Sequence, residues 1–127
     1  MSKLEAVHAD AAPKAIGPYS QAIKAGDTVW LSGQIPLNPE TMEVEAQDIA
    51  GQTRQVFDNL VAVAAAAGGT LSDAVKINIS LVDLGHFAEV NAIMSEYFNE
   101  PYPARACVQV AALPRAVLVE IEAVLVV

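Results

Sequence analysis

Apolar and polar residues alternate most regularly along residues 74–82. The apolar positions are Val75, Ile77, Ile79 and Leu81, and the residues between them are Lys76, Asn78 and Ser80. Successive side chains of a β-strand point to opposite faces of a sheet, so this period of two predicts a strand with one buried face. Shorter segments predict strands over residues 21–24 and 28–32, joined by a turn at Ala25-Gly26-Asp27.

Two segments have the period of a helix. Residues 49–67 follow Asp48, whose side chain suits a helix cap, and Gly68-Gly69 ends the segment. The apolar stripe of this predicted helix is Val56, Leu60, Val63 and Ala67. A second helix is predicted from Asp83 or Leu84 to about Phe98. Its apolar stripe is Phe87, Val90, Met94, Tyr97 and Phe98, and Asn91 borders it.

The alternation of side chains in the C-terminal part of the chain predicts two strands, which are joined by a loop at Leu113-Pro114-Arg115. In the first strand, Arg105, Cys107 and Gln109 share one face. In the second, one face is wholly apolar and consists of Val117, Val119, Ile121, Ala123 and Leu125. The opposite face carries Leu118, Glu120, Glu122, Val124 and Val126. Because one face packs on the helices, apolar residues on the other predict contact with a second copy of the chain.

The predicted order of elements defines one α+β domain over residues 1–127. Two strands and a further short strand, which the pattern does not locate, precede the first helix. A strand, the second helix and two strands follow, which gives a mixed six-stranded sheet with both helices on one face. Residues 9–20 and 35–46 are rich in Pro and Gly or in polar residues and predict irregular backbone.

Composition narrows the classes of function. The hydrophobic fraction of 54% exceeds the usual value, although no apolar run is long enough for a bilayer, and we therefore expect an oligomer. A net charge of −8 without a basic cluster argues against nucleic-acid and anionic-membrane partners. A single cysteine excludes an internal disulfide, and no hydrophobic signal segment is evident near residue 1, so the cytoplasm is expected.

Arg105 and Glu120 are the strongest candidates for chemistry, because both lie on strands that otherwise read as buried. Arg105 either forms an ion pair with Glu120 or Glu122, or binds a substrate carboxylate through two parallel hydrogen bonds. Glu120 either pairs with Arg105 or Lys76, or orients a water and transfers protons. On their own, Cys107 is most simply a small buried residue, and Tyr19 is either a pocket wall or ordinary packing.

Four segments together resemble the RidA/YjgF family of reactive intermediate (enamine/imine) deaminases. They are AIGPYSQA at residues 15–22, LSGQIP at 31–36, PARAC at 103–107, and Leu113-Pro114 with VEIE at 119–122. The resemblance spans nearly the whole chain. It implies a chorismate-mutase-like fold assembled as a homotrimer, with a cleft at each subunit interface.

The resemblance also implies an activity and a set of site residues. Active members hydrolyse 2-imino acids, such as 2-iminobutanoate and 2-iminopropanoate, to 2-oxo acids and ammonia, without a cofactor or metal. By position, Arg105 matches the arginine that anchors the substrate carboxylate, and Glu120 matches the acid that positions water. The matching pocket positions are Tyr19, Ser32, Asn91 and Cys107. The alternative is a non-enzymatic trimer that binds small carboxylates as a regulator, or a chaperone-like protein.

Overall fold

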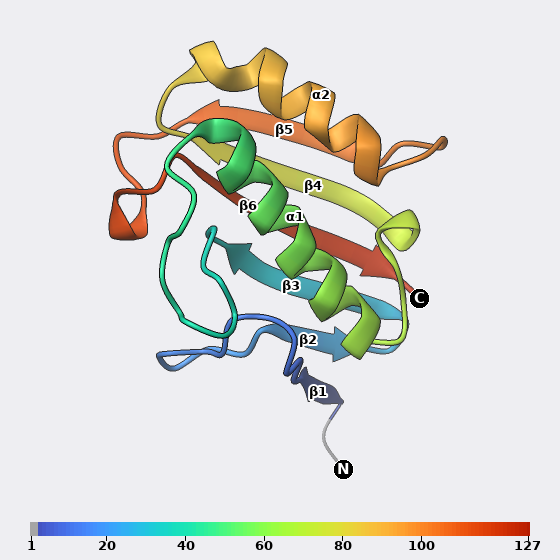
Figure 1. The fold of residues 1–127 in the computed structure, drawn as a ribbon. Coiled ribbons are helices and arrows are strands. Elements are labelled where there is room, and N and C mark those ends of the chain that lie inside the picture. Colours follow the sequence, from blue (N-terminus) through green and yellow to red (C-terminus); the bar gives the residue numbers. More distant parts are fainter. Residues whose placement is uncertain (1–2) are drawn as a thin grey trace.

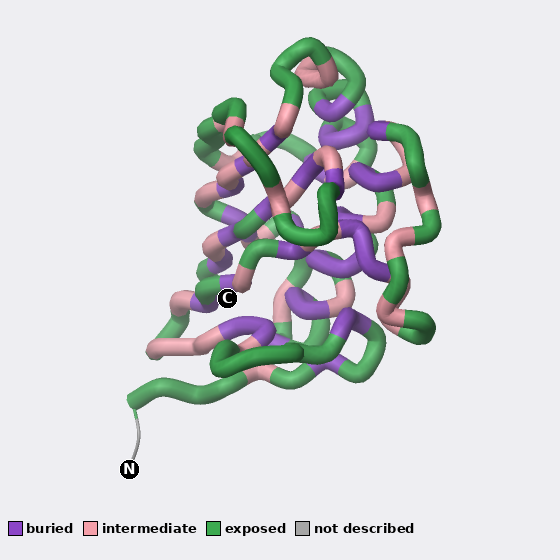
Figure 2. The backbone as a smooth tube through the Cα atoms, turned by 90° about the vertical axis from the view of Figure 1, so that its left-hand side faces the viewer, coloured by how far each residue is buried: buried purple, intermediate pink, exposed green. Residues whose placement is uncertain are grey.

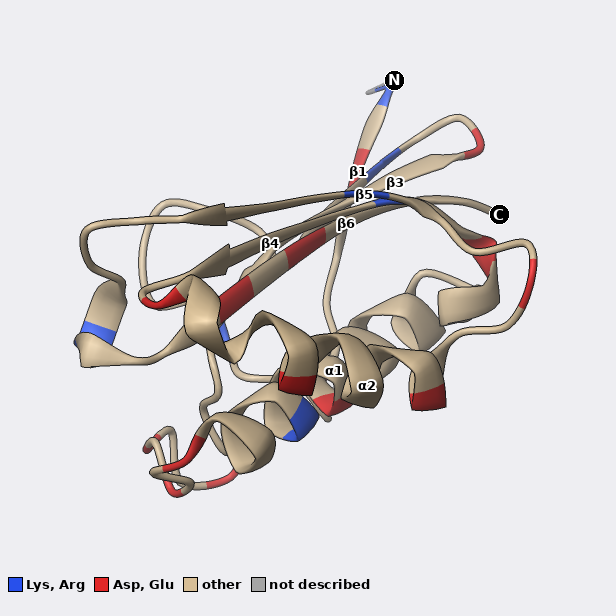
Figure 3. Ribbon diagram, turned by 90° about the horizontal axis from the view of Figure 1, so that it is seen from above, with Lys and Arg blue, Asp and Glu red and all other residues tan. Residues whose placement is uncertain are grey.

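The computed structural model describes residues 3–127 and has two layers, a sheet and a pair of helices (Figure 1). The strands are β1 (Leu4–Val7), β2 (Ala22–Ala25), β3 (Thr28–Gln34), β4 (Ala74–Leu81), β5 (Ala104–Gln109) and β6 (Val119–Val126). The α-helices are α1 (Ile49–Ala66) and α2 (Phe87–Tyr97). Both helices cover the same face of the sheet, as Figure 3 shows from above. The predicted α+β architecture is confirmed; residues 1 and 2 of the predicted domain lie outside the described residues.

The six strands form one mixed sheet in the order β1-β2-β3-β6-β4-β5. Its only parallel pair within residues 3–127 is β4 with β5, and α2 makes the crossover between these two strands. The C-terminal strand β6 is central and pairs antiparallel with β3 and β4. This topology leaves β5 at one edge of the sheet, with α2 beside it (Figure 1).

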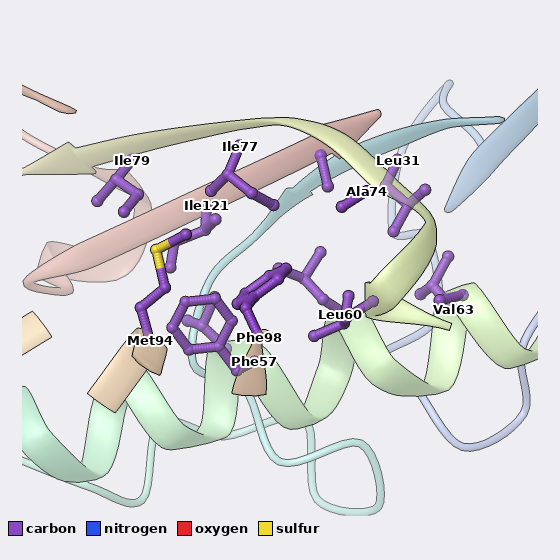
Figure 4. Close-up of a cluster of buried hydrophobic side chains, with 14 of the residues drawn as sticks. Leu31, Phe57, Leu60, Val63, Ala74, Ile77, Ile79, Met94, Phe98 and Ile121 are labelled. Atoms are coloured by element: carbon purple, nitrogen blue, oxygen red, sulfur yellow. The ribbon is translucent and has the colours of Figure 1, made fainter. Parts of the chain in front are cut away.

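The core lies between the sheet and α1. Val56, Leu60 and Val63 of the predicted stripe are completely buried, and Figure 4 shows Leu60 and Val63 pointing from α1 toward the strands. Burying each such side chain contributes about 1.5–3 kcal/mol. The predicted apolar face of β6 is also confirmed, because Val119, Ile121, Ala123 and Leu125 are all buried. Buried positions consequently alternate with more exposed ones along β6 (Figure 2).

Two details of the strands did not follow from the sequence pattern. The further short strand, which the pattern did not locate, is β1, and it precedes the other two N-terminal strands. Its residues are mostly exposed and it pairs with β2 through the backbone, so it lacks the apolar alternation that marks a buried strand. Val75 was expected on the buried face but is 46% exposed. A register shift between Ala74 and Lys76 gives the buried position to Ala74.

The second face of the sheet carries apolar side chains that no helix of residues 3–127 covers. Trp30, Val108 and Val126 are exposed there, and Val124 is partly buried. These residues come from β3, β5 and β6. Leu118, which was expected on this face, is partly buried and packs against the core instead. We call this surface the open face.

Candidate functional site

Arg105 lies on the edge strand β5, on the face covered by the helices. It is in register with Ile77 of β4, which is completely buried under the helices, and side chains paired in this way share a face. Its guanidinium donates from Nη1 to Asn91 Oδ1 on α2, and it lies 5.1 Å from the centre of the Phe87 ring. Nη1 also lies 3.8 Å from Met94 Sδ. One polar contact and two apolar neighbours on α2 therefore fix the direction of Arg105.

A groove of about 480 Å³ opens beside this guanidinium. Its lining consists of Asn91, Met94, Ser95, Tyr102, Pro103 and Arg105. Among residues 3–127, Arg105 has no ion-pair partner, and the neighbours that orient it are uncharged. A guanidinium has five N–H donors, so the contact with Asn91 leaves capacity for a bidentate carboxylate. The groove is thus able to bind a small anion.

Cys107 lies two residues after Arg105 on the same face of β5 and is in register with Ile79. Burial raises the pKa of its thiol, and the nearby charge of Arg105 opposes that shift only in part. A thiol with a raised pKa is protonated at neutral pH and is a poor nucleophile. Cys107 is therefore suited to packing and backbone contact beside Arg105.

Glu120 lies on the open face. On β6 it alternates with the buried Val119 and Ile121, and it is in register with Ser80 of β4. Two adjoining hollows share Glu120 and Gly33. The larger, of about 290 Å³, is lined by Pro13, Lys14, Ile16, Tyr19, Gly33, Gln34, Ile35, Leu37, Pro114 and Glu120. We call it the Glu120 hollow.

The carboxyl group of Glu120 is partly desolvated. Burial is the main cause that raises its pKa, and the neighbouring carboxylate of Glu122 raises it further. Glu122 itself accepts a hydrogen bond from Asn78 Nδ2 at 3.1 Å. A carboxyl group with a raised pKa exchanges protons with water and substrate nearer neutral pH than an exposed one.

Gly33 is a further site residue, for which the sequence pattern predicted no role beyond its place in the segment LSGQIP. A β-carbon at this position would lie 2.7 Å from Glu120 Oε1 and 3.0 Å from Glu120 Cδ. The absence of a side chain therefore makes room for the carboxyl group. A glycine inside a strand often marks close approach by another group, and the β3–β6 register shift between Leu31 and Gln34 is a second indication.

Tyr19 and Ser32 lie on the Glu120 side of the sheet. Tyr19 lines the Glu120 hollow with an exposed side chain. Ser32 precedes Gly33, and its hydroxyl donates to the carbonyl of Ser20 at 2.6 Å. The backbone N–H of Ser32 also donates to Gln21 O at 3.0 Å. Ser32 thus connects β3 to the segment that carries Tyr19.

The six predicted site residues therefore form two groups on opposite faces of the sheet. Arg105, Asn91 and Cys107 lie at the edge formed by β5 and α2. Glu120, Tyr19 and Ser32 lie toward the open face and the loops near it. Within residues 3–127, no group of three or more His, Cys, Asp or Glu side chains is arranged to hold a metal ion. None of the described helices is long and apolar enough to cross a membrane.

Comparison with known proteins defines the family. The model of the endoribonuclease L-PSP family matches residues 9–127, and the chain belongs to this family, that of the RidA/YjgF proteins. A RutC family protein of Pyrococcus horikoshii is 49% identical over 120 residues, which cover 94% of this chain and 95% of that protein. The 2-iminobutanoate/2-iminopropanoate deaminase of Escherichia coli is 49% identical over 116 residues, 89% of this chain and 90% of the enzyme.

The fold agrees with this assignment. The crystal structure of RidA from the Antarctic bacterium Psychrobacter sp. superimposes with a TM-score of 0.94 at 50% identity, covering 97% of this chain and 99% of that one. The predicted RidA/YjgF fold is therefore confirmed. The family includes imine deaminases as well as proteins with other names.

Proposed function

We propose that this protein hydrolyses 2-imino acids, such as 2-iminobutanoate and 2-iminopropanoate, to 2-oxo acids and ammonia. The observation that carries the proposal is the separation of Arg105 from Glu120. Each lies in its own hollow, and neither neutralises the other. A cation oriented by uncharged neighbours suits a substrate carboxylate, and a carboxyl group with a raised pKa suits proton transfer. The deaminase from Escherichia coli supports the same assignment.

The complete site then requires two copies of the chain. One copy supplies Arg105, Asn91 and Cys107 from its β5–α2 edge, and a neighbouring copy supplies Glu120 and Tyr19. The uncovered apolar residues Trp30, Val108 and Val126 support such contact, since burying them removes apolar surface from water. Three copies arranged head to tail would close a ring and form three equivalent sites.

In the proposed reaction Arg105 binds the carboxylate and fixes the imine carbon near Glu120 of the neighbouring copy. Ionised Glu120 accepts a proton from a water molecule while the water oxygen adds to the C=N carbon. The electrons of the C=N π bond move to nitrogen, and Glu120 gives the proton it took from water to that nitrogen, which forms a neutral carbinolamine. Glu120 next accepts the hydroxyl proton of the carbinolamine and passes it to nitrogen. The C–N bond breaks as the C=O bond forms, ammonia leaves, and Glu120 is ionised again. The chain's own contribution is positioning and proton transfer.

Two properties of the chain suit this role. A 2-imino acid is a small monoanion, so a single arginine is able to hold it despite the net charge of −8. These imines also hydrolyse in water without a catalyst, so a site with one cation and one proton-transfer group is adequate. The cytoplasm is the proposed location, since the single cysteine needs no oxidising compartment.

A coupled assay tests the proposal. Threonine dehydratase generates 2-iminobutanoate in place, and the release of 2-oxobutanoate is followed with and without this protein. We expect faster release with the wild type and no acceleration with Arg105→Ala. Arg54→Ala is the matched control, because Arg54 pairs with Glu96 at 2.8 Å on the outside of the helices. A wild-type rate equal to that of buffer would favour the carboxylate-binding or chaperone-like alternative.

A further inference from the structure

Four of the five buried polar side chains in the described chain either line the Glu120 hollow or bond to the backbone of segments that form or adjoin its lining. Among residues 3–127 the buried polar residues are Gln21, Gln34, Gln52, Thr53 and Asn59. Gln34 lines the hollow directly. Gln21, Gln52 and Asn59 are only 3%, 4% and 1% exposed, and each makes hydrogen bonds to backbone groups outside its own element.

Asn59 holds the wall formed by residues 35–37. From α1, its Nδ2 donates to the carbonyls of Leu37 at 3.0 Å and Ile35 at 3.3 Å. Its own Oδ1 accepts a hydrogen bond from Gln55 Nε2 at 2.9 Å, which fixes the orientation of the amide. Ile35 and Leu37 both line the Glu120 hollow.

Gln21 holds a second wall, formed by the segment before Tyr19. Its Nε2 donates to Pro13 O at 2.8 Å and to Ala9 O at 3.0 Å. Its Oε1 accepts from Ala9 N at 2.7 Å. Pro13 lines the hollow, so one buried amide, on the residue before β2, holds an otherwise irregular segment of the wall.

Gln52 holds the start of the strand that carries Glu120. Its Oε1 accepts from Leu118 N at 2.8 Å, and its Nε2 donates to Ala46 O at 3.1 Å. Leu118 lies between Pro114, which lines the hollow, and Glu120 itself. This contact fixes the backbone two residues before the carboxyl group.

We propose that Gln21, Gln52 and Asn59 are positioning residues that fix three walls of the Glu120 hollow from the core. The inference rests on the proposed function for its catalytic consequence. An irregular segment has several alternative conformations, and a buried amide selects the one that satisfies its donors and acceptors. Leaving such a group unpaired is costly, so the three segments are held together with the packed core. Stabilising one conformation of the walls keeps Glu120 in place for proton transfer.

Gln52→Met is the main test variant, because methionine has a similar volume and lacks both polar groups. We expect kcat for imine hydrolysis to fall about tenfold, while KM changes less than twofold because Arg105 lies in the other hollow. Asn59→Leu removes the hydrogen bonds to a different wall, and we expect the same pattern. Thr53→Val is the matched control: Thr53 is buried in α1 between these positions, and its hydroxyl has no hydrogen-bond partner among residues 3–127. It should leave both constants unchanged.

Hydrogen exchange in the wild type supplies a readout that needs neither activity nor a folded variant. We expect the Leu118 amide to exchange as slowly as that of Ile121 inside β6, and exchange at the rate of an exposed loop would overturn the proposal. An active wild type with unchanged kcat in folded Gln52→Met and Asn59→Leu would also overturn it, although the deaminase assignment would stand. An inactive wild type with a protected Leu118 would instead reject the deaminase assignment and retain the fixed walls.

Discussion

Arg105 and Glu120 lie on opposite faces of the same sheet. Arg105 is in register with the buried Ile77 on the helix-covered face, whereas Glu120 is in register with Ser80 on the open face. The backbone of β4 lies between their strands. A small substrate that touches both residues must therefore contact two copies of the chain. This relationship makes assembly a condition of the proposed activity.

Mixed assemblies test that condition directly. Arg105→Ala should be inactive alone and Glu120→Gln should lose most of its turnover, because every site lacks one of its two groups. After the variants are dissociated, mixed in equal amounts and reassembled, some sites combine Arg105 from one copy with Glu120 from the other. In a ring of head-to-tail contacts we expect about a quarter of wild-type activity. Absence of any recovery in a confirmed mixed oligomer would mean that each site draws both residues from one chain.

Replacement of Arg105 by lysine separates charge from geometry. Lysine keeps the positive charge but loses the planar fork that binds a carboxylate through two parallel hydrogen bonds. We expect kcat/KM to fall roughly 10- to 100-fold, mostly through KM, because a charge-assisted hydrogen bond contributes about 1.5–3 kcal/mol. Steady-state kinetics of Arg105→Lys beside Arg54→Lys measure the difference. Equal kinetics in the two variants would remove Arg105 from carboxylate binding.

Periodicity predicted the helices and the buried strands because each of these elements buries one stripe or face. The positions of α1, β4 and β6 follow directly from Val56, Ile77 and Ile121 and their spaced neighbours. It did not locate β1, since a mostly exposed edge strand held through its backbone has no such pattern. The strand pattern singled out Arg105 and Glu120, and the resemblance added the pocket positions, but their distribution over two faces depends on the register of β5 and β6 against β4.

The supporting residues of the Glu120 hollow were even less visible in the sequence. Gln21, Gln52 and Asn59 are polar and read as surface residues, yet the structure buries them against irregular backbone. Their partners are backbone groups between 6 and 66 residues away, and sequence spacing does not reveal such contacts. Gly33 offered a local signal, because it interrupts a strand, but the group that it accommodates comes from β6.

The pH dependence of the reaction should report Glu120. Burial and the charge of Glu122 raise its pKa, so the ionised form that accepts a proton from water is lost at a higher pH than for an exposed glutamate. We expect the acidic limb of kcat to lie above the ordinary glutamate pKa of about 4.3. Glu122→Gln removes one cause of the shift, so its limb should move to lower pH. An unchanged limb in an intact assembly would contradict the coupling of these carboxylates.

The raised pKa of Glu120 also makes the free energy of unfolding depend on pH, and here a rise in pH is unfavourable, whereas it favours catalysis. Because the pKa of Glu120 is higher in the folded chain than in the unfolded chain, folding favours its protonated form. The resulting stabilisation is fully present below the unfolded-state pKa and is lost as the pH rises through the folded-state pKa. Glu120→Gln is neutral at every pH, so the stability of this variant relative to wild type should rise over that interval. Denaturant unfolding of both proteins from pH 4 upward measures this difference in the free energy of unfolding. A difference that stays constant with pH would exclude the raised pKa.

Gly33→Ala tests the close approach to Glu120. The added methyl group would lie 2.7 Å from Glu120 Oε1, but this atom ends a flexible side chain, so we expect the protein to fold with the carboxyl group displaced. kcat should fall about tenfold, since misplacement of a proton-transfer group by about 1 Å is costly. The same substitution in a Glu120→Gln background should cause little further loss, because it acts through a group that is already removed. Equal losses in both backgrounds would show that Gly33 acts on the site independently of Glu120.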